Sequence, residues 1–177
     1  MLEKFITDEQ AERLPHNRLL ELLHYEKETG VFTWIGRTGR GSNIRIGDAA
    51  GSIDHYGYAI IYIGGKHYKA HRLAWFYVTG EWPRHQIDHK DMNKINNAWT
   101  NLREATHGQN QHNATIRTDN TSGYKGVHWN KHSKKWRARI MVGKKYLLLG
   151  DFDDITEAHE AYVTAAQKHH ADFARAK

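Results

Sequence analysis

Residues 85–113 are His-Gln-Ile-Asp-His-Lys-Asp-Met-Asn-Lys-Ile-Asn-Asn-Ala-Trp-Thr-Asn-Leu-Arg-Glu-Ala-Thr-His-Gly-Gln-Asn-Gln-His-Asn, and this stretch decides how the middle of the chain folds. It combines an Asp-His pair at 88–89 with a cluster of asparagines. Carboxylate, imidazole and amide groups are poor material for a hydrophobic core, but they bind hard divalent cations and move protons. The stretch therefore predicts a functional centre.

The order of residue types in this stretch predicts a strand, a loop, a second strand and a helix. Ile87 is the apolar anchor of a short strand over 86–89, and the Asp- and Asn-rich residues 90–97 favour turns. Residues 100–103 form a second short strand or a tight return. Thr106 is placed to cap the helix that follows, because its hydroxyl can accept an unpaired backbone N–H.

In this arrangement the end of the first strand and one face of the helix converge. We therefore expect Asp88 and Asn110 to bind one metal ion. A ligand pair made only of oxygen atoms suits Mg²⁺ or Mn²⁺, which keep water and phosphate oxygens as their other ligands. His89 lies next to Asp88 and is expected to deprotonate a water molecule for attack on phosphorus.

The same stretch resembles the HNH nuclease motif, the ββα-metal finger of phage and intron homing endonucleases. The matching pattern is Ile-Asp-His, Asn-Lys-x-Asn-Asn, Thr-Asn-Leu-Arg and Gln-Asn, in that order. By position, the resemblance implies that His89 is the general base and that Asp88 and Asn110 are the metal ligands. It implies that Asn101 is the middle asparagine, which holds the backbone or ring of the histidine. Many HNH proteins have a histidine ligand where Asn110 stands, so His107 and His112 remain alternatives.

The 177 residues include no cysteine, which excludes disulfides and cysteine-based zinc sites. No apolar run is long enough to cross a membrane, and the N-terminus lacks the apolar region of a signal peptide. We therefore expect a soluble cytoplasmic protein, located in the bacterial host if a phage encodes it. A hydrophobic content of 39% favours small modules over one large core.

Positive charge is concentrated in one part of the chain. The net charge is +6 and the pI about 9.4. Residues 1–113 carry 14 Lys/Arg and 13 Asp/Glu, residues 114–150 carry nine and one, and residues 151–177 carry three and six. A basic module of this kind suits a polyanionic partner such as DNA.

The segment before the motif predicts a platform of sheet and helix. Residues 58–63 and 67–70 form a hairpin around Gly64-Gly65, and residues 71–79 have the apolar density of a buried helix. Trp75 and Phe76 are expected in the core, and His71 is expected to be structural. The glycine-rich residues 36–51 carry Arg37, Arg40 and Arg45, and they are either a flexible loop or a loop that touches DNA phosphates.

The C-terminal part predicts a second module. Residues 127–129, 136–142 and 146–149 are short strand candidates, and Ala138 and Ile140 alternate with Arg137 and Arg139. This period of two gives one apolar and one basic face. Residues 156–173 follow as a helix with Thr156 as its expected cap, and its alanines let it pack on the apolar face.

This module resembles an AP2 domain, a three-stranded sheet with one helix that is found fused to phage HNH nucleases. The resemblance is carried by Ser-Gly-Tyr-Lys-Gly-Val, Trp-Arg-Ala-Arg-Ile, Leu-Gly-x-Phe and Glu-Ala-x-x-Ala-Tyr within residues 122–174. It implies that the sheet enters a DNA major groove. The residues expected to contact DNA are Lys125, His128, Trp129, Lys131, Lys135, Arg137, Arg139, Lys144, Lys145 and Tyr146. Leu148 replaces a DNA-facing tryptophan of that family.

The sequence as a whole predicts an α+β protein. Its expected parts are a platform with the HNH finger over 1–113, a linker over 114–121 and an AP2-like DNA-binding domain over 122–177. The expected function is a metal-dependent endonuclease that acts on double-stranded DNA in phage homing or nicking. Each chain has one HNH finger, so we expect a monomer that nicks one DNA strand. The alternative is a non-catalytic DNA-binding regulator with a degenerate HNH fold.

Overall fold

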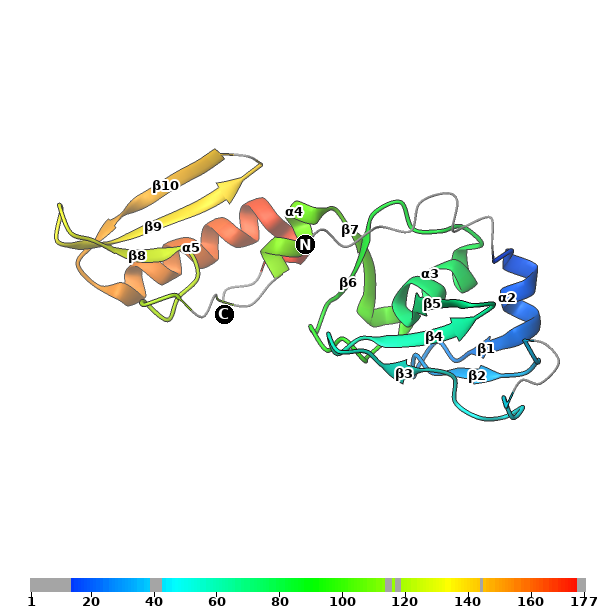
Figure 1. The fold of residues 1–177 in the computed structure, drawn as a ribbon. Coiled ribbons are helices and arrows are strands. Elements are labelled where there is room, and N and C mark those ends of the chain that lie inside the picture. The colour runs from blue at the N-terminus through cyan, green and yellow to red at the C-terminus, as the bar shows by residue number, and fades with distance from the viewer. Residues whose placement is uncertain (1–13, 39–42, 114–115, 117–118, 144, 175–177) are drawn as a thin grey trace. The chain divides into compact units, whose positions relative to one another are not determined.

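The computed structural model describes residues 14–38, 43–113, 116, 119–143 and 145–174. It confirms an α+β fold with small antiparallel sheets (Figure 1). The chain forms two compact units, Met1–Glu104 and Ala105–Lys177. Within the described ranges no helix has the length and apolar character needed to cross a bilayer.

The first unit ends at the close of the second motif strand, earlier than the limit at residue 113 that the sequence predicts. The short helix that follows counts with the second unit, where it contacts the last 3₁₀ turn of the chain. The proposed linker over 114–121 stays a prediction, since half of its residues lie outside the described ranges.

Two small sheets and two helices build the platform of the first unit. Its elements are α2 His16–Leu22, β1 Leu23–Tyr25, β2 Phe32–Trp34, β3 Ser52–Ile53, β4 Ala59–Ile63, β5 Lys66–Lys69 and α3 Ala70–Thr79. β1 pairs with β2, and β4 lies between β3 and β5, with all of these pairs antiparallel. The hairpin around Gly64-Gly65 and the helix after it confirm the predicted platform.

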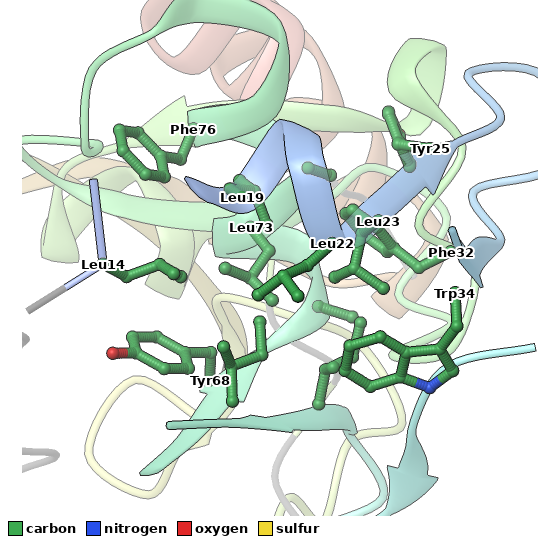
Figure 2. Packing of buried hydrophobic residues seen from close by; sticks show 14 of the residues in the cluster. Leu14, Leu19, Leu22, Leu23, Tyr25, Phe32, Trp34, Tyr68, Leu73 and Phe76 are labelled. Carbon is green, nitrogen blue, oxygen red and sulfur yellow. The ribbon is translucent and has the colours of Figure 1, made fainter. Parts of the chain in front are cut away.

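A single hydrophobic cluster holds the platform together (Figure 2). Leu19, Leu22 and Leu73 are fully buried in it, and burying each such side chain contributes about 1.5–3 kcal/mol. Phe76 lies in this cluster and Trp75 packs against it, as predicted. α3 ends at Gly80, whose φ of 78° allows its N–H to bond the carbonyl of Phe76 at 2.9 Å.

The motif folds as the predicted strand, loop, strand and helix. Its elements are β6 Gln86–His89, the 3₁₀ turn η1 Trp99–Asn101, β7 Leu102–Ala105 and α4 His107–Asn113. β6 and β7 form a two-stranded sheet. Thr106 caps α4 as predicted, since its hydroxyl accepts from the N–H of Gln109 at 3.4 Å. The Gln109 side chain accepts from the Thr106 N–H at 2.9 Å, which completes a capping box.

The second unit contains a three-stranded antiparallel sheet and one long helix. Its elements are β8 Val127–Asn130, β9 Lys135–Val142, β10 Lys145–Phe152, α5 Ile155–His170 and η2 Ala171–Phe173. The strand order is β10-β9-β8, and α5 buries Ala158 and Tyr162 in a cluster with Ala138 and Ile140 of β9. The cap of α5 is Asp154 rather than Thr156, because the Asp154 carboxylate accepts from two backbone N–H groups of the first turn.

Candidate active site at the end of strand β6

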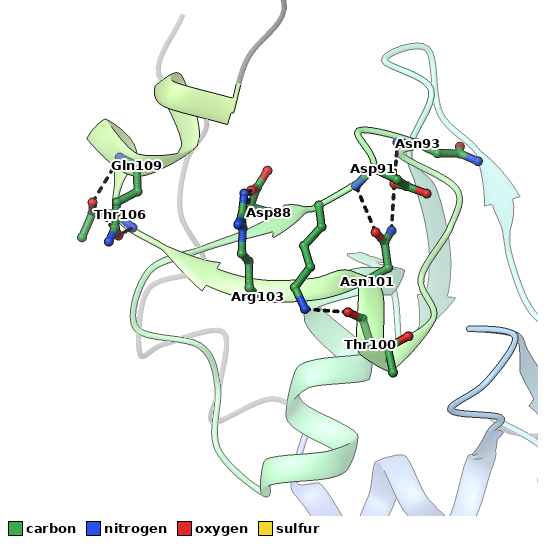
Figure 3. A network of polar contacts seen from close by, with 9 residues as sticks. Asp88, Asp91, Asn93, Thr100, Asn101, Arg103, Thr106 and Gln109 are labelled. Carbon is green, nitrogen blue, oxygen red and sulfur yellow. Dashed lines mark hydrogen bonds and ion pairs between the residues drawn. The ribbon is translucent and has the colours of Figure 1, made fainter. Parts of the chain in front are cut away.

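Asp88 and His89 lie side by side at the end of β6 and are almost fully buried, with exposed fractions of 6% and 5%. The Asp88 carboxylate is paired with Arg103 of β7. The Nε and Nη2 atoms of Arg103 lie 2.9 and 2.8 Å from Asp88 Oδ2 (Figure 3). No role for Arg103 could be predicted from the sequence, because Arg103 faces Asp88 only through the pairing of β6 with β7.

The imidazole of His89 lies in a cage of polar and aromatic side chains. Its Nε2 lies 3.1 Å from Oδ1 of Asn97. The ring of His71 stands nearly perpendicular to it, with centroids 5.1 Å apart, and the ring of Tyr58 lies at 6.2 Å. Burial lowers the pKa of His89 below 6.5, although the Asn97 bond and the carboxylates of Asp91 and Asp88 oppose this effect. The ring is therefore neutral at pH 7, the form that a general base needs.

His71 lies beside His89, and its expected structural role stays a prediction. It is buried, and its Nδ1 has no hydrogen-bond partner among the described residues. Burial is the main cause that lowers the pKa of His71 well below 6.5, and a positive charge on the neighbouring His89 would lower it further. A neutral ring in this position forms a wall beside His89 without adding charge.

Asn101 organises the loop that follows His89. Its Nδ2 donates to Oδ1 of Asp91 at 2.9 Å and to the carbonyl of Asn96 at 2.8 Å, and its Oδ1 accepts from the Asp91 N–H (Figure 3). The Asn101 carbonyl accepts from the N–H of Lys90. These bonds fix the backbone directly after the histidine. The ring itself is contacted by Asn97, which belongs to the Asn-Lys-x-Asn-Asn part of the motif and had no predicted role of its own.

The predicted helix ligands lie on α4, which belongs to the second unit. The N–H of Asn110 bonds the carbonyl of Thr106, and Nε2 of His107 lies 2.9 Å from Nε2 of Gln111. The side chain of His112 lies outside the described part of the chain. The pairing of Asn110 with Asp88, and the alternatives His107 and His112, therefore remain predictions.

The donor chemistry at this site fits a hard divalent cation. No cluster of three or more His, Asp or Glu side chains that could hold a metal ion occurs among the described residues. The carboxylate of Asp88, with water and phosphate oxygens as the other ligands, matches the way in which Mg²⁺ is usually bound. One Asp88 oxygen pairs with Arg103, and a carboxylate has capacity for further partners at its second oxygen.

Two lysines lie near the cage. Lys94 belongs to the Asn-Lys-x-Asn-Asn part of the motif, and no role for Lys94 or Lys69 was predicted from the sequence. The ammonium of Lys94 lies 4.8 Å from the centroid of the Tyr58 ring and donates to the carbonyl of Tyr56 at 3.0 Å. The ammonium of Lys69 lies 4.4 Å from the same ring and pairs with Asp54 at 2.6 Å. Lys94 makes no ion pair with a described carboxylate, so its charge is available to a phosphate group.

The exposed face of the second sheet carries part of the predicted basic surface. Arg139 is exposed, and its guanidinium lies 4.4 Å from the centroid of the Tyr146 ring. Arg137 instead binds Asp151 through two hydrogen bonds of 2.6 and 2.7 Å. The Arg137 guanidinium lowers the pKa of Asp151 to about 2. Charge on this face is therefore partly neutralised by a residue that follows the basic segment in the chain.

The remaining predicted DNA contacts divide into several groups. Lys135 pairs with the exposed Asp153 at 2.9 Å, and Lys145 is exposed at the start of β10. Trp129 stands two residues after the buried Val127 and pairs with Trp136, so it lies on the helix-covered side of the sheet rather than on the basic face. It is 46% exposed. The others are Lys125 before β8, His128 within β8, Lys131 in the turn after β8, and Lys144, which lies outside the described residues.

The loop with the three platform arginines is described only in part. Arg40 lies outside the described residues. Arg45 lines an open groove of about 580 Å³, together with Trp34 and Tyr62. Whether this loop contacts DNA stays a prediction.

Comparison with known proteins identifies the family. The family model described as HNH endonuclease matches residues 68–112. Protein 3.8 of Escherichia phage T7 is 34% identical over 113 residues, which are 61% of this chain and 92% of that protein. The solved structure titled "DNA binding and cleavage by the HNH homing endonuclease I-HmuI" matches 84% of this chain and 85% of that chain, with a TM-score of 0.40 and 22% identity. The chain therefore belongs to the family of phage T7 Protein 3.8 and carries an HNH endonuclease domain over residues 68–112.

Proposed function

We propose that this protein is a metal-dependent DNA endonuclease of the HNH type. The observation that carries the proposal is the buried imidazole of His89, adjacent to the carboxylate of Asp88 within the matched domain, and burial lowers the pKa of this imidazole. A neutral imidazole accepts a proton at pH 7, and a carboxylate beside it can hold a cation that binds phosphate.

In this proposal the residues of the chain have separate tasks. His89 accepts the proton of the attacking water at a ring nitrogen, and Asn101 fixes the backbone after it. Asp88 and Asn110 would hold one Mg²⁺ or Mn²⁺. When bound, such an ion polarises the scissile phosphate and stabilises the leaving 3′ oxygen. Lys94 is positioned to attract a phosphate of the same strand.

The second unit supplies DNA affinity in this proposal, as an AP2-like domain. Its three-stranded sheet with one covering helix and its exposed Arg139 and Tyr146 support that role. The phage relative supports a phage origin. The matched HNH endonuclease domain supports DNA as the substrate, and the proposed place of action is double-stranded DNA in the bacterial cytoplasm. We further propose a monomer that nicks one strand, because each chain carries one HNH motif.

One observation favours a second candidate function. Asp88 already has a cationic partner in Arg103, which is a credible arrangement for a site that no longer binds metal. A non-catalytic DNA-binding regulator with an HNH fold is therefore the alternative.

A plasmid assay separates the two candidates. Supercoiled plasmid is incubated with the full-length protein and Mg²⁺ or Mn²⁺, and then with EDTA. If the protein is a nuclease, the supercoiled plasmid should be converted to open circles in either metal. It should stay supercoiled in EDTA, because oxygen ligands hold the cation with few protein contacts. Unchanged plasmid in both metals, together with a mobility shift on DNA, would support the regulator. Cleavage in EDTA would remove the metal from the mechanism.

The sheet face gives a prediction about salt dependence. Arg139→Ala is expected to weaken DNA binding and to reduce the slope of log affinity against log salt by about one, because each cation on a phosphate releases roughly one counterion. Arg137→Ala is expected to have the smaller effect, since Asp151 already neutralises Arg137. Fluorescence anisotropy on labelled duplex at several salt concentrations measures both.

Lys168→Ala provides the matched control, because this exposed lysine lies on α5 rather than on the sheet. It should leave the slope unchanged. An Arg139→Ala protein with the slope of the unchanged protein would exclude the sheet face as the phosphate-binding surface.

A further inference from the structure

We propose that Asn97 is a positioning residue that fixes the orientation and tautomer of His89, so that Nδ1 is the atom that accepts the proton of water. The proposal rests on the proposed function, in which His89 is the general base. It assigns Asn97 a task that the HNH pattern gave to Asn101, whose side chain bonds Asp91 and Asn96 instead.

The first step is the orientation of the Asn97 amide. Its Nδ2 donates to the carbonyl of Ile95 at 3.3 Å, and a carbonyl can only accept. The oxygen of the amide must therefore face the ring of His89, where Oδ1 lies 3.1 Å from Nε2. The contact with Ile95 therefore distinguishes the oxygen of the Asn97 amide from its nitrogen without any assumption about the His89 ring.

The second step is the tautomer. An amide oxygen carries no hydrogen, so the bond forms only when Nε2 of His89 carries the proton. A neutral imidazole has one N–H, and the other nitrogen then holds the free electron pair. The base atom is accordingly Nδ1. A flipped ring would lose the bond, and the adjacent ring of His71 at 5.1 Å restricts the space for intermediate orientations.

The third step is the rigidity of Asn97 itself. It is 3% exposed, and its carbonyl accepts from the hydroxyl of Tyr25 at 2.6 Å. A Cβ added at Gly30, whose φ is +74°, would overlap the backbone of Asn97 and Ala98. The hairpin of β1 and β2 thus packs directly on the residue that holds the ring, and Asn97 acts on His89 from a fixed position.

The test compares three variants of the full-length protein. Asn97→Leu keeps the size of the side chain and removes the acceptor, and Asn97→Asp keeps an acceptor oxygen. Asn96→Ala is the matched control, since the Asn96 side chain bonds Asp91 and the N–H of Ala98 in the same loop but not the ring. Single-turnover cleavage rates and DNA dissociation constants are measured for each, and ¹⁵N NMR of the ring nitrogens reports the tautomer of His89.

We expect Asn97→Leu to lower the single-turnover rate about 10- to 100-fold at unchanged DNA affinity, as the loss of an orienting partner usually does. Asn97→Asp should recover part of the rate, because it restores the acceptor at Nε2 of His89 but places its second oxygen against the carbonyl of Ile95. Asn96→Ala should stay close to the unchanged protein. Equal losses of cleavage rate in Asn97→Leu and Asn96→Ala would show that Asn97 only supports the loop, and would overturn the proposal. So would a full rate in Asn97→Leu, or an Nδ1–H tautomer of His89 in the unchanged protein.

The NMR measurement also separates this proposal from the proposed function. If the unchanged protein cuts no DNA, the endonuclease assignment fails, while the tautomer of His89 and its loss in Asn97→Leu can still be read. If the protein cuts DNA and the tautomer is the other one, only the role of Asn97 fails.

Discussion

His89→Ala is expected to lower the rate of DNA cleavage by at least about 100-fold, because general-base catalysis of this kind contributes about 10²–10⁴-fold. The affinity for DNA should be almost unchanged, since the imidazole is buried and handles a proton rather than the duplex. Single-turnover cleavage and a gel-shift titration on the same duplex measure the two quantities. A large loss of rate at constant affinity is the expected pair of results.

The matched control is His85→Ala, because His85 is an exposed histidine just before the same strand. It should keep full activity. The pH profile of the unchanged protein adds a second check. Burial lowers the pKa of His89 below 6.5, so its imidazole stays unprotonated down to about pH 6.5. The cleavage rate should therefore fall only below that pH, where the ring becomes protonated. Near-normal turnover in His89→Ala would exclude the imidazole from the mechanism.

Asp88→Ala is expected to have two separate effects. The first is loss of the metal-dependent reaction, because a carboxylate ligand is removed. The second is a loss of stability of about 3–5 kcal/mol, the usual result of removing one partner of a buried ion pair. The side chain of Arg103 is only 13% exposed and would be left without its carboxylate. Thermal unfolding and a Mg²⁺ titration of cleavage measure the two effects.

The double variant Asp88→Ala with Arg103→Leu separates ligand loss from destabilisation. It removes the buried cation together with its carboxylate partner, so it should regain much of the stability and none of the cleavage. Asp153→Ala is the control for an ordinary ion pair, since Asp153 and Lys135 are exposed and such pairs contribute about 0–1 kcal/mol. Recovery of cleavage in the double variant would show that Asp88 supports the fold and is not a ligand.

Local patterns in the sequence were sufficient to predict most elements. The alternation of Ala138 and Ile140 with arginines specified both the strand and its buried face, and the structure confirms it. The boundary between α2 and β1 has no signal in the sequence, because Leu19, Leu20, Leu22 and Leu23 form one apolar run. In the structure Leu22 closes α2 and Leu23 begins β1, and both are buried in the same cluster. Hydrophobicity alone does not mark such a boundary.

The contacts within the site were less accessible from sequence. Asp88 and His89 could be placed together because they are neighbours in the chain. The partners Arg103 and Asn97 depend on strand pairing and on the path of a loop, neither of which leaves a periodic signal. The pairing of Arg137 with Asp151 was hidden for the same reason, because it depends on the register of β9 against β10. Side-chain chemistry was therefore predictable, but the choice of partners was not.

The close approach of Gly30 to the backbone of Asn97 has a consequence for how this HNH domain can be recombined. The family model begins at residue 68, yet Tyr25 and Gly30 support the loop that carries Asn97. A matched segment transplanted alone into a new host protein would keep every signature residue and lose that support. Exchange between related nucleases should therefore succeed when the hairpin and the motif are inherited from the same parent, and chimaeras that mix them should carry a misaligned base.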